Sequence, residues 1–201
     1  ETSDGVELGV RYAGKAAYAS LSGYYNRYDD FIESMRFIGY NDDGLMVYQS
    51  QNISEAQIHG VEFKAGLDIG AWSDAWDGWS LRGATAWSRG EDRSADTPLD
   101  SVDPLTATLG LAYDAPSWGA ELAGRFVDRK RRVSDPAYYR QPGYGVLDLY
   151  AHWDFAPGAR FNVGVFNLGD RTYIEAGDIA LVLDTSTTLA RYTAPGRRLS
   201  A

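Results

Sequence analysis

Residues 61–69, Val-Glu-Phe-Lys-Ala-Gly-Leu-Asp-Ile, alternate apolar and polar side chains without interruption. A period of two over nine residues is typical of a β-strand with one apolar and one polar face. Segments with the same alternation, strong or weak, are 6–12, 17–32, 79–89, 105–113, 118–126, 147–155 and 160–168. With one more strand beginning at Arg197, the sequence predicts nine strands and an all-β fold.

The connections between these strands are alternately short and long along the chain. The short ones are 14–15, 71–78, 114–117 and 156–158, and the long ones are 33–45, 91–104, 131–142 and 169–195. Tight turns on one rim and long loops on the other are typical of an antiparallel transmembrane β-barrel. A soluble β-sandwich also has alternating strands, so it stays open as an alternative.

Strand parity indicates that the chain is a segment of a larger barrel. If nine strands run alternately up and down, the first and last are parallel, whereas bacterial single-chain barrels have even strand numbers. The last predicted strand, Arg197–Ala201, is also shorter than the roughly 9–11 residues that cross a membrane. We therefore expect a barrel segment of about nine strands.

Composition excludes several classes of function. The 201 residues include 19 Lys and Arg against 28 Asp and Glu, a net charge of −9, which argues against a nucleic-acid partner. There is no Cys, and His59 and His152 are the only histidines, so we expect no metal site. The sequence has no nucleophile-elbow, dinucleotide-binding or phosphate-loop motif, and we expect no catalytic residues and no enzyme.

Seven blocks, in order, carry a family resemblance. They are ETSDGVELGVRY (1–12), SGYYNRYDDFIES (22–34), QNISEAQIHGVEF (51–63), PLTATLGLAYDAPSWG (104–119), PGYGVLDLYAHWDF (142–155), VFNLGDRTY (165–173) and APGRRLSA (194–201). Together they resemble the C-terminal part of TonB-dependent outer-membrane receptors. The blocks at 25–33 and 52–62 most resemble the haem/haemoglobin (and transferrin/lactoferrin) receptor group.

The resemblance implies a fold, a location and a function. Such receptors are 22-stranded barrels around an N-terminal plug, of which residues 1–201 would be the C-terminal part, without the plug or the earlier strands. They lie in the Gram-negative outer membrane and import haem or ferric siderophores, with energy delivered by the TonB complex through the plug. Haem or siderophore would be cargo, not a resident cofactor. The family's ligand His and the terminal aromatic residue have no counterpart in this sequence.

Within this framework the long loops supply the candidate cargo contacts. The densest basic run lies at the external rim, and tyrosines lie in the loops; the candidates are Arg129, Lys130, Arg131, Arg132, Tyr40, Tyr138 and Tyr139. The basic run has three interpretations: a docking site for an anionic cargo, a contact with lipopolysaccharide phosphates, or a solvated loop. The apolar run 179–183 is interpreted as a short hairpin, with a lid over cargo as the alternative.

The charged residues of the polar strand face are predicted to face the lumen and the plug. They are Glu7, Arg11, Glu62, Lys64, Asp68, Arg82, Glu121, Arg125, Asp148 and His152. Two other functions remain as alternatives to a transporter. One is a soluble ligand- or carbohydrate-binding β-sandwich, and the other is an outer-membrane adhesin or enzyme barrel.

Overall fold

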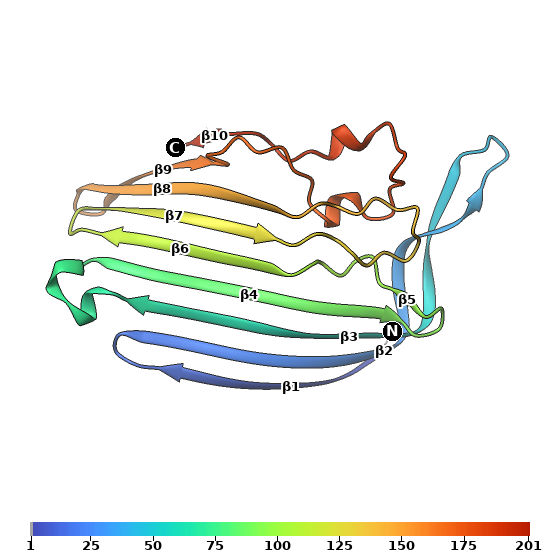
Figure 1. Ribbon diagram of the computed structural model, residues 1–201, viewed down its shortest axis with the longest axis horizontal. Helices are drawn as coiled ribbons and strands as arrows, with labels where there is room; N and C mark the ends of the chain where they lie inside the picture. The colour runs from blue at the N-terminus through green and yellow to red at the C-terminus, as the bar shows by residue number, and fades with distance from the viewer. Residues whose placement is uncertain (1) are drawn as a thin grey trace.

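A single antiparallel sheet contains all the strands of the computed structural model, which describes residues 2–201 (Figure 1). The strands are β1 (Thr2–Ala13), β2 (Ala17–Tyr40), β3 (Met46–Asp68), β4 (Trp79–Asp92), β5 (Thr97–Pro98), β6 (Thr106–Asp114), β7 (Trp118–Val127), β8 (Tyr144–Ala156), β9 (Ala159–Phe166) and β10 (Arg198–Ser200). Four short 3-10 turns are η1 (Gly70–Trp72), η2 (Asp74–Trp76), η3 (Gly177–Ile179) and η4 (Leu189–Tyr192). No helix within residues 2–201 has the length and apolar character needed to cross a membrane.

Strands that are neighbours in sequence are also neighbours in the sheet. The order is β1-β2-β3-β4-β6-β7-β8-β9-β10. The short strand β5 lies off this path and pairs with β4 at its C-terminal end, at Glu91 and Asp92. This path contains the nine strands that the alternation predicts, and each pair on it is antiparallel. The first and last strands do not pair, so the sheet is open.

Cross-strand pairing places the apolar side chains on one face. One row runs through Leu67, Leu81, Leu111, Leu122, Leu149, Val165 and Leu199 from β3 to β10. Because directly paired residues point to the same side of a sheet, the row is a continuous apolar stripe. Leu109, Leu122 and Leu149 are between 39% and 51% exposed, so no second layer covers this part of the sheet. A β-sandwich, which would bury that face, is therefore wrong.

Aromatic side chains mark the short-turn end of the apolar face. The rings of Trp79, Tyr113 and Trp118 follow one another with centroids 5.2 Å apart, and Trp118 pairs with Trp153 across β7 and β8. At the other end of β4, eight residues further on, Trp87 lies on the same face. At about 3.3 Å per residue this is roughly 26 Å along the strand, comparable with the ~25 Å apolar band of outer-membrane barrels.

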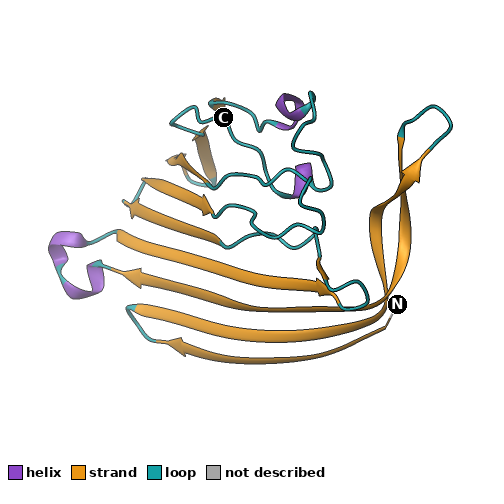
Figure 2. Ribbon diagram, turned by 45° about the vertical axis from the view of Figure 1, so that its right-hand side comes forward, coloured by secondary structure: helices purple, strands orange, loops and turns teal. Residues whose placement is uncertain are grey.

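The long-loop prediction was wrong for 33–45. There β2 continues to Tyr40 and β3 begins at Met46, so only 41–45 form the turn of a hairpin that projects beyond the rest of the sheet (Figures 1 and 2). The alternation breaks at Asp30, which has φ 55°, and the pairing shifts register twice further on. These irregularities hide the strand from a strict period-two reading, although the backbone pairing resumes beyond them.

The apolar run 179–183 does not form a hairpin either. Ile179 ends the turn η3 and is 2% exposed, while Leu181 has φ 65°. The left-handed conformation of Leu181 interrupts the extended backbone, and, unlike at Asp30, no strand resumes between η3 and η4. Leu183 instead makes one isolated antiparallel bridge with Tyr138.

Candidate functional site

Three long loops form a joined layer at the end of the sheet opposite the short turns. We call 93–105 the first loop, 128–143 the second loop and 167–197 the last loop. The second and last loops pair through their backbones: Tyr139 N donates to Val182 O at 2.7 Å, and Asp184 N donates to Ala137 O at 2.9 Å. Connecting segments that share hydrogen bonds in this way form one surface.

Lys130 holds the first and second loops together from inside. Its side chain is 8% exposed, and its ammonium donates to Asp100 O at 3.0 Å and to Val102 O. Burial lowers the pKa of Lys130, and the nearby carboxylates of Asp100 and Asp103 oppose that shift. The buried Asp100 carboxylate in turn accepts from Ser134 N at 3.0 Å and from the Ser134 hydroxyl. Lys130 thus acts as an internal tie between the loops.

The last loop is fixed at its base by Asn167. This residue is 5% exposed, has φ 52°, and its backbone N donates to an Asp148 carboxylate oxygen at 2.7 Å. Its side-chain amide accepts from Arg171 N at 2.8 Å and donates to Arg171 O at 2.9 Å. A second donation, to Pro195 O at 3.4 Å, connects the start of the loop to its end.

Further along, the last loop packs on the polar face of the wall through Arg125. The guanidinium donates to Glu175 Oε1 at 2.7 Å, and its Cζ lies 5.3 Å from the ring centre of Tyr144 and 5.9 Å from that of Tyr173. The two tyrosine rings stack at 4.4 Å. Arg125, Tyr144, Tyr173 and Glu175, which we call the Arg125 cluster, combine an ion pair with cation–π contacts.

The β2–β3 hairpin reaches the last loop at Tyr48, whose hydroxyl donates to Leu181 O at 3.2 Å. Burial raises the pKa of the Tyr48 hydroxyl, and the nearby hydroxyls of Tyr40 and Tyr192 add to the effect. Tyr40 is 67% exposed. Tyrosines from the hairpin and from η4 therefore lie near one another at the loop end of the molecule.

The seven loop candidates occupy different environments. Arg129 and Arg131 are exposed, and Arg131 pairs with Asp128 at 3.1 Å. Arg132 donates to Glu91 Oε1 at 3.0 Å. Lys130 and Tyr138 are buried inside the loop layer, while Tyr139 is half-buried and Tyr40 is exposed. All four basic residues line one cleft, but only Arg129 and Arg131 are exposed.

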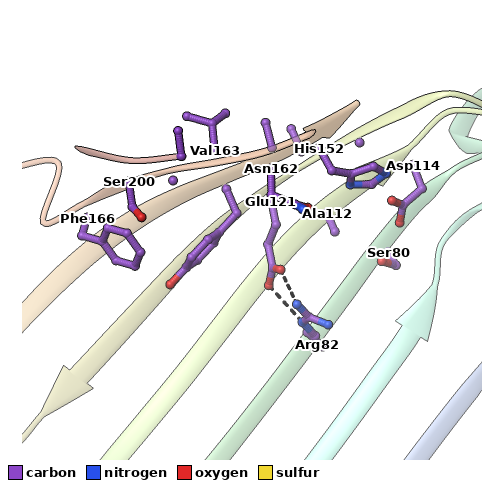
Figure 3. Close-up of a pocket in the computed structure, with 16 residues that line it drawn as sticks. Ser80, Arg82, Ala112, Asp114, Glu121, His152, Asn162, Val163, Phe166 and Ser200 are labelled. Atoms are coloured by element: carbon purple, nitrogen blue, oxygen red, sulfur yellow. Dashed lines mark hydrogen bonds and ion pairs between the residues drawn. The ribbon is translucent and has the colours of Figure 1, made fainter. Parts of the chain in front are cut away.

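The ten polar-face candidates do share one side of the sheet. Pairings such as Glu7 with Tyr24, Arg82 with Gly110 and Glu121 with Tyr150 place them opposite the apolar stripe. Arg82 and Glu121 form a bidentate ion pair, with Nε donating to Oε1 at 2.9 Å (Figure 3). They line a polar hollow of 450 Å³ that also includes His152 and Asn162. Within residues 2–201, no three His, Asp or Glu side chains are grouped so that they could hold a metal ion.

Sequence reasoning missed the residues that organise the loops. Asn167 and Asp170 both have positive φ, at 52° and 49°, and the stretch Asn-Leu-Gly-Asp (167–170) is a turn signal that points to such a site. The partners of Arg125 are different, because Tyr173 and Glu175 lie 48 and 50 residues away from it. Nothing local in the sequence indicates those contacts.

Comparisons with known proteins agree with this geometry. Hemoglobin-haptoglobin utilization protein B of Neisseria meningitidis serogroup A is 26% identical over an alignment of 237 positions, gaps included. The alignment covers 95% of this chain and 29% of the relative. Probable hemoglobin and hemoglobin-haptoglobin-binding protein 4 of Haemophilus influenzae is 26% identical over 65% of this chain and 14% of its own length. The chain thus spans less than a third of these relatives.

Solved structures show the same architecture. Copper transporter OprC superposes with a TM-score of 0.81 at 26% identity, over 98% of this chain and 30% of that one. The ferric enterobactin receptor PfeA of Pseudomonas aeruginosa gives a TM-score of 0.72 at 21% identity, again over 98% and 30%. A sequence model of the family described as TonB dependent receptor-like, beta-barrel, matches residues 1–168. The chain therefore belongs to the TonB-dependent receptor β-barrel family, and its open antiparallel sheet is a segment of that barrel.

Proposed function

We propose that this chain forms part of the wall and external loops of an outer-membrane receptor that takes up haem from haemoglobin-type sources. The apolar stripe would face lipid, and the loop layer would face the outside of the cell. The observation that carries this proposal is the exposed apolar row from β3 to β10, since hydrocarbon is the environment that suits it. Haem would be transported cargo and not a resident cofactor.

The cargo class is supported by the relatives. The curated relatives in Neisseria and Haemophilus are named for haemoglobin or haemoglobin–haptoglobin, whereas the solved structures are named for copper, enterobactin or iron transport. A haemoglobin surface is far larger than a siderophore and needs an extended contact area. The long β2–β3 hairpin, with exposed Tyr40, and the last loop provide such an area.

The polar face would contact the plug, through which the TonB complex would supply energy. Its charges alternate in sign, as in the Lys64–Glu62 pair at 3.7 Å and the Arg82–Glu121 pair. Pairs of this kind in a wet lumen contribute little stability and mainly fix orientation. We assign them the positioning of the plug against the wall.

Growth tests the function directly. The full-length receptor is expressed in an iron-starved Gram-negative host without haem receptors of its own, with haemoglobin, ferric enterobactin or no added iron source. Growth on haemoglobin that disappears in a host without TonB is the expected result. Growth on enterobactin alone, or haemoglobin-dependent growth that persists without TonB, would contradict the proposal. Copper uptake by the same cells tests the alternative that the receptor carries copper, the cargo for which OprC is named.

A further inference from the structure

The wall opens where β4 and β6 part. These strands pair from Trp79–Tyr113 to Ala86–Thr106, whereas β4 continues to Asp92, paired with β3 and β5 but not with β6. The space beyond the last pair is a cleft of 310 Å³. It is bounded by the upper part of β4, by the first loop and by the start of the second loop.

The floor of this cleft continues the apolar face. Trp87 pairs with Val61, and Val61 pairs with Gly23, in the row next to Leu21 and Phe63. Trp87 and Leu105 are each 42% exposed and both line the cleft. An indole and an isobutyl group at this level, with Trp87 two residues before Arg89 on the same face of β4, are typical of the boundary between hydrocarbon and headgroups.

The rim of the cleft is cationic. Arg89 pairs with His59, and His59 pairs with Tyr25, in the next row on the same face as Trp87, so the Arg89 side chain lies on the lipid-facing side. Arg129 and Arg131 line the cleft from the second loop, and both are exposed. In total, five cationic side chains line it against two acidic ones, in a chain whose net charge is −9. Positive charge is therefore concentrated at this place.

The arginines retain capacity for an anion. Arg89 and Arg132 share one carboxylate, with Glu91 Oε1 at 3.0 Å from an Nη atom of each. The buried Nη1 of Arg132 has no hydrogen-bond partner among residues 2–201. Asp128 is the carboxylate that Arg131 meets. The guanidinium groups thus have more hydrogen-bond donors than the nearby carboxylates can accept. This excess of donors favours the binding of a further anion with several oxygen atoms.

We infer that this cleft binds a phosphorylated glycolipid of the outer leaflet, with phosphate at Arg89, Arg129 and Arg131 and acyl chain on Trp87 and Leu105. Transported cargo would meet the lumen or the loop tips, whereas this cleft opens beside the lipid-facing stripe. A solvated basic loop would not require an exposed apolar floor beneath it. The inference rests on the proposed placement in an outer membrane, and it assigns the basic run a role outside cargo capture.

The test measures lipid binding and uptake separately on the full-length receptor. Delipidated receptor in detergent is titrated with lipid A carrying its phosphates, and bound lipid is counted by native mass spectrometry. The variant carries Arg89→Gln, Arg129→Gln and Arg131→Gln; Arg132 is retained because its bond to Glu91 joins the second loop to β4. The matched control removes three cations at the short-turn end, with Arg11→Gln, Lys15→Gln and Arg160→Gln. The temperature-dependent gel mobility of each variant reports its folding.

The expected result is that wild type and control bind equally, while the triple variant binds at least about tenfold more weakly. Dephosphorylated lipid A should bind the wild type as weakly as the variant binds intact lipid A. Equal binding of intact lipid A by wild type and triple variant would overturn the inference. A variant that keeps lipid binding but loses haemoglobin-dependent growth would overturn it too, and would return these arginines to cargo docking. Loss of growth by the wild type itself would count against the proposed function alone.

Discussion

The β2–β3 hairpin and the last loop both extend beyond the sheet, but they are stabilised in different ways. Between Ile38 and Ser50 the hairpin has no buried residue, and its backbone pairing continues with register shifts. The last loop has almost no regular pairing, yet Asn167, Ala176 and Ile179 are at most 8% exposed. The hairpin depends on strand hydrogen bonds, while the last loop depends on buried side chains with defined partners.

This difference indicates where each segment is sensitive to change. Strand pairing involves every backbone group and tolerates most side chains, so single substitutions in the hairpin have small effects. A loop without pairing relies on a few polar groups, and a buried group left without its partner costs about 1–3 kcal/mol. The following predictions test this contrast from the largest expected effect to the smallest.

Asn167→Ala should have the largest effect. It removes the amide contacts with Arg171 and Pro195 and places Ala at φ 52°, a combination we expect to cost about 3 kcal/mol locally. Hydrogen exchange across 169–196 in the detergent-solubilised receptor should accelerate, while exchange in β7 and β8 stays slow. Asn167→Gly should lose less protection from exchange, because glycine tolerates the positive φ. An equal loss of protection in both variants would show that backbone strain plays no part.

Lys130→Met should loosen the first and second loops by a smaller amount. Methionine keeps most of the apolar stem but leaves Asp100 O and Val102 O without the ammonium, at a cost of about 2 kcal/mol. Limited proteolysis should then cut within 93–105, and the β2–β3 hairpin should be unaffected. Arg129→Met, at an exposed neighbouring position, is the matched control. Unchanged proteolysis in Lys130→Met would mean that Asp100 and Ser134 alone hold these loops.

Acid should weaken the contact between β4 and the second loop. Burial pushes the pKa of Glu91 up, but hydrogen bonds from Arg132, Arg89 and Gln57 outweigh it and hold the pKa below its ordinary value of 4.5. A lowered folded-state pKa contributes stability above the ordinary value, and this stability is lost as pH falls through the folded-state value. The protection factors of amides 128–134, which are corrected for the intrinsic pH dependence of exchange, should therefore be constant down to about pH 5 and fall below pH 4.5. Glu91→Gln should remove this dependence.

Shortening the hairpin should have the smallest effect on the barrel. The variant lacks residues 34–50 and joins the paired residues Glu33 and Gln51 through an Asn-Gly turn. Its free energy of unfolding should differ from that of the wild type by no more than about 0.5 kcal/mol. If the hairpin contacts cargo as proposed, haemoglobin binding by whole cells should fall at unchanged receptor abundance. A destabilised barrel would instead indicate that the hairpin supports the last loop, for example through Tyr48 and Leu181.

The sequence predicted what depends on local alternation and failed where distant residues decide. The nine strands and the two faces follow from the period of two, because each strand meets only neighbours in sequence. The hairpin was missed because the pairing shifts register between Glu33 and Arg36 and again between Phe37 and Gly39, so a strict period of two does not continue beyond residue 32. The burial of Lys130 and the partners of Arg125 were not predictable, since they arise from loops that come together only after the strands have paired. From its charge, Lys130 was predicted to contact cargo together with Arg129 and Arg131, but its ammonium group instead binds the backbone carbonyls of the first loop.

The strand order has an evolutionary consequence. Since each strand along the sheet bonds to those before and after it in the chain, one up-and-down pair is a self-contained unit of wall. Duplicating or deleting such a unit would widen or narrow the circumference by two strands and keep the total even, which closure requires. Receptors with barrels of different diameter can therefore arise from one ancestral sequence, while the remaining strands keep the pairing partners they had.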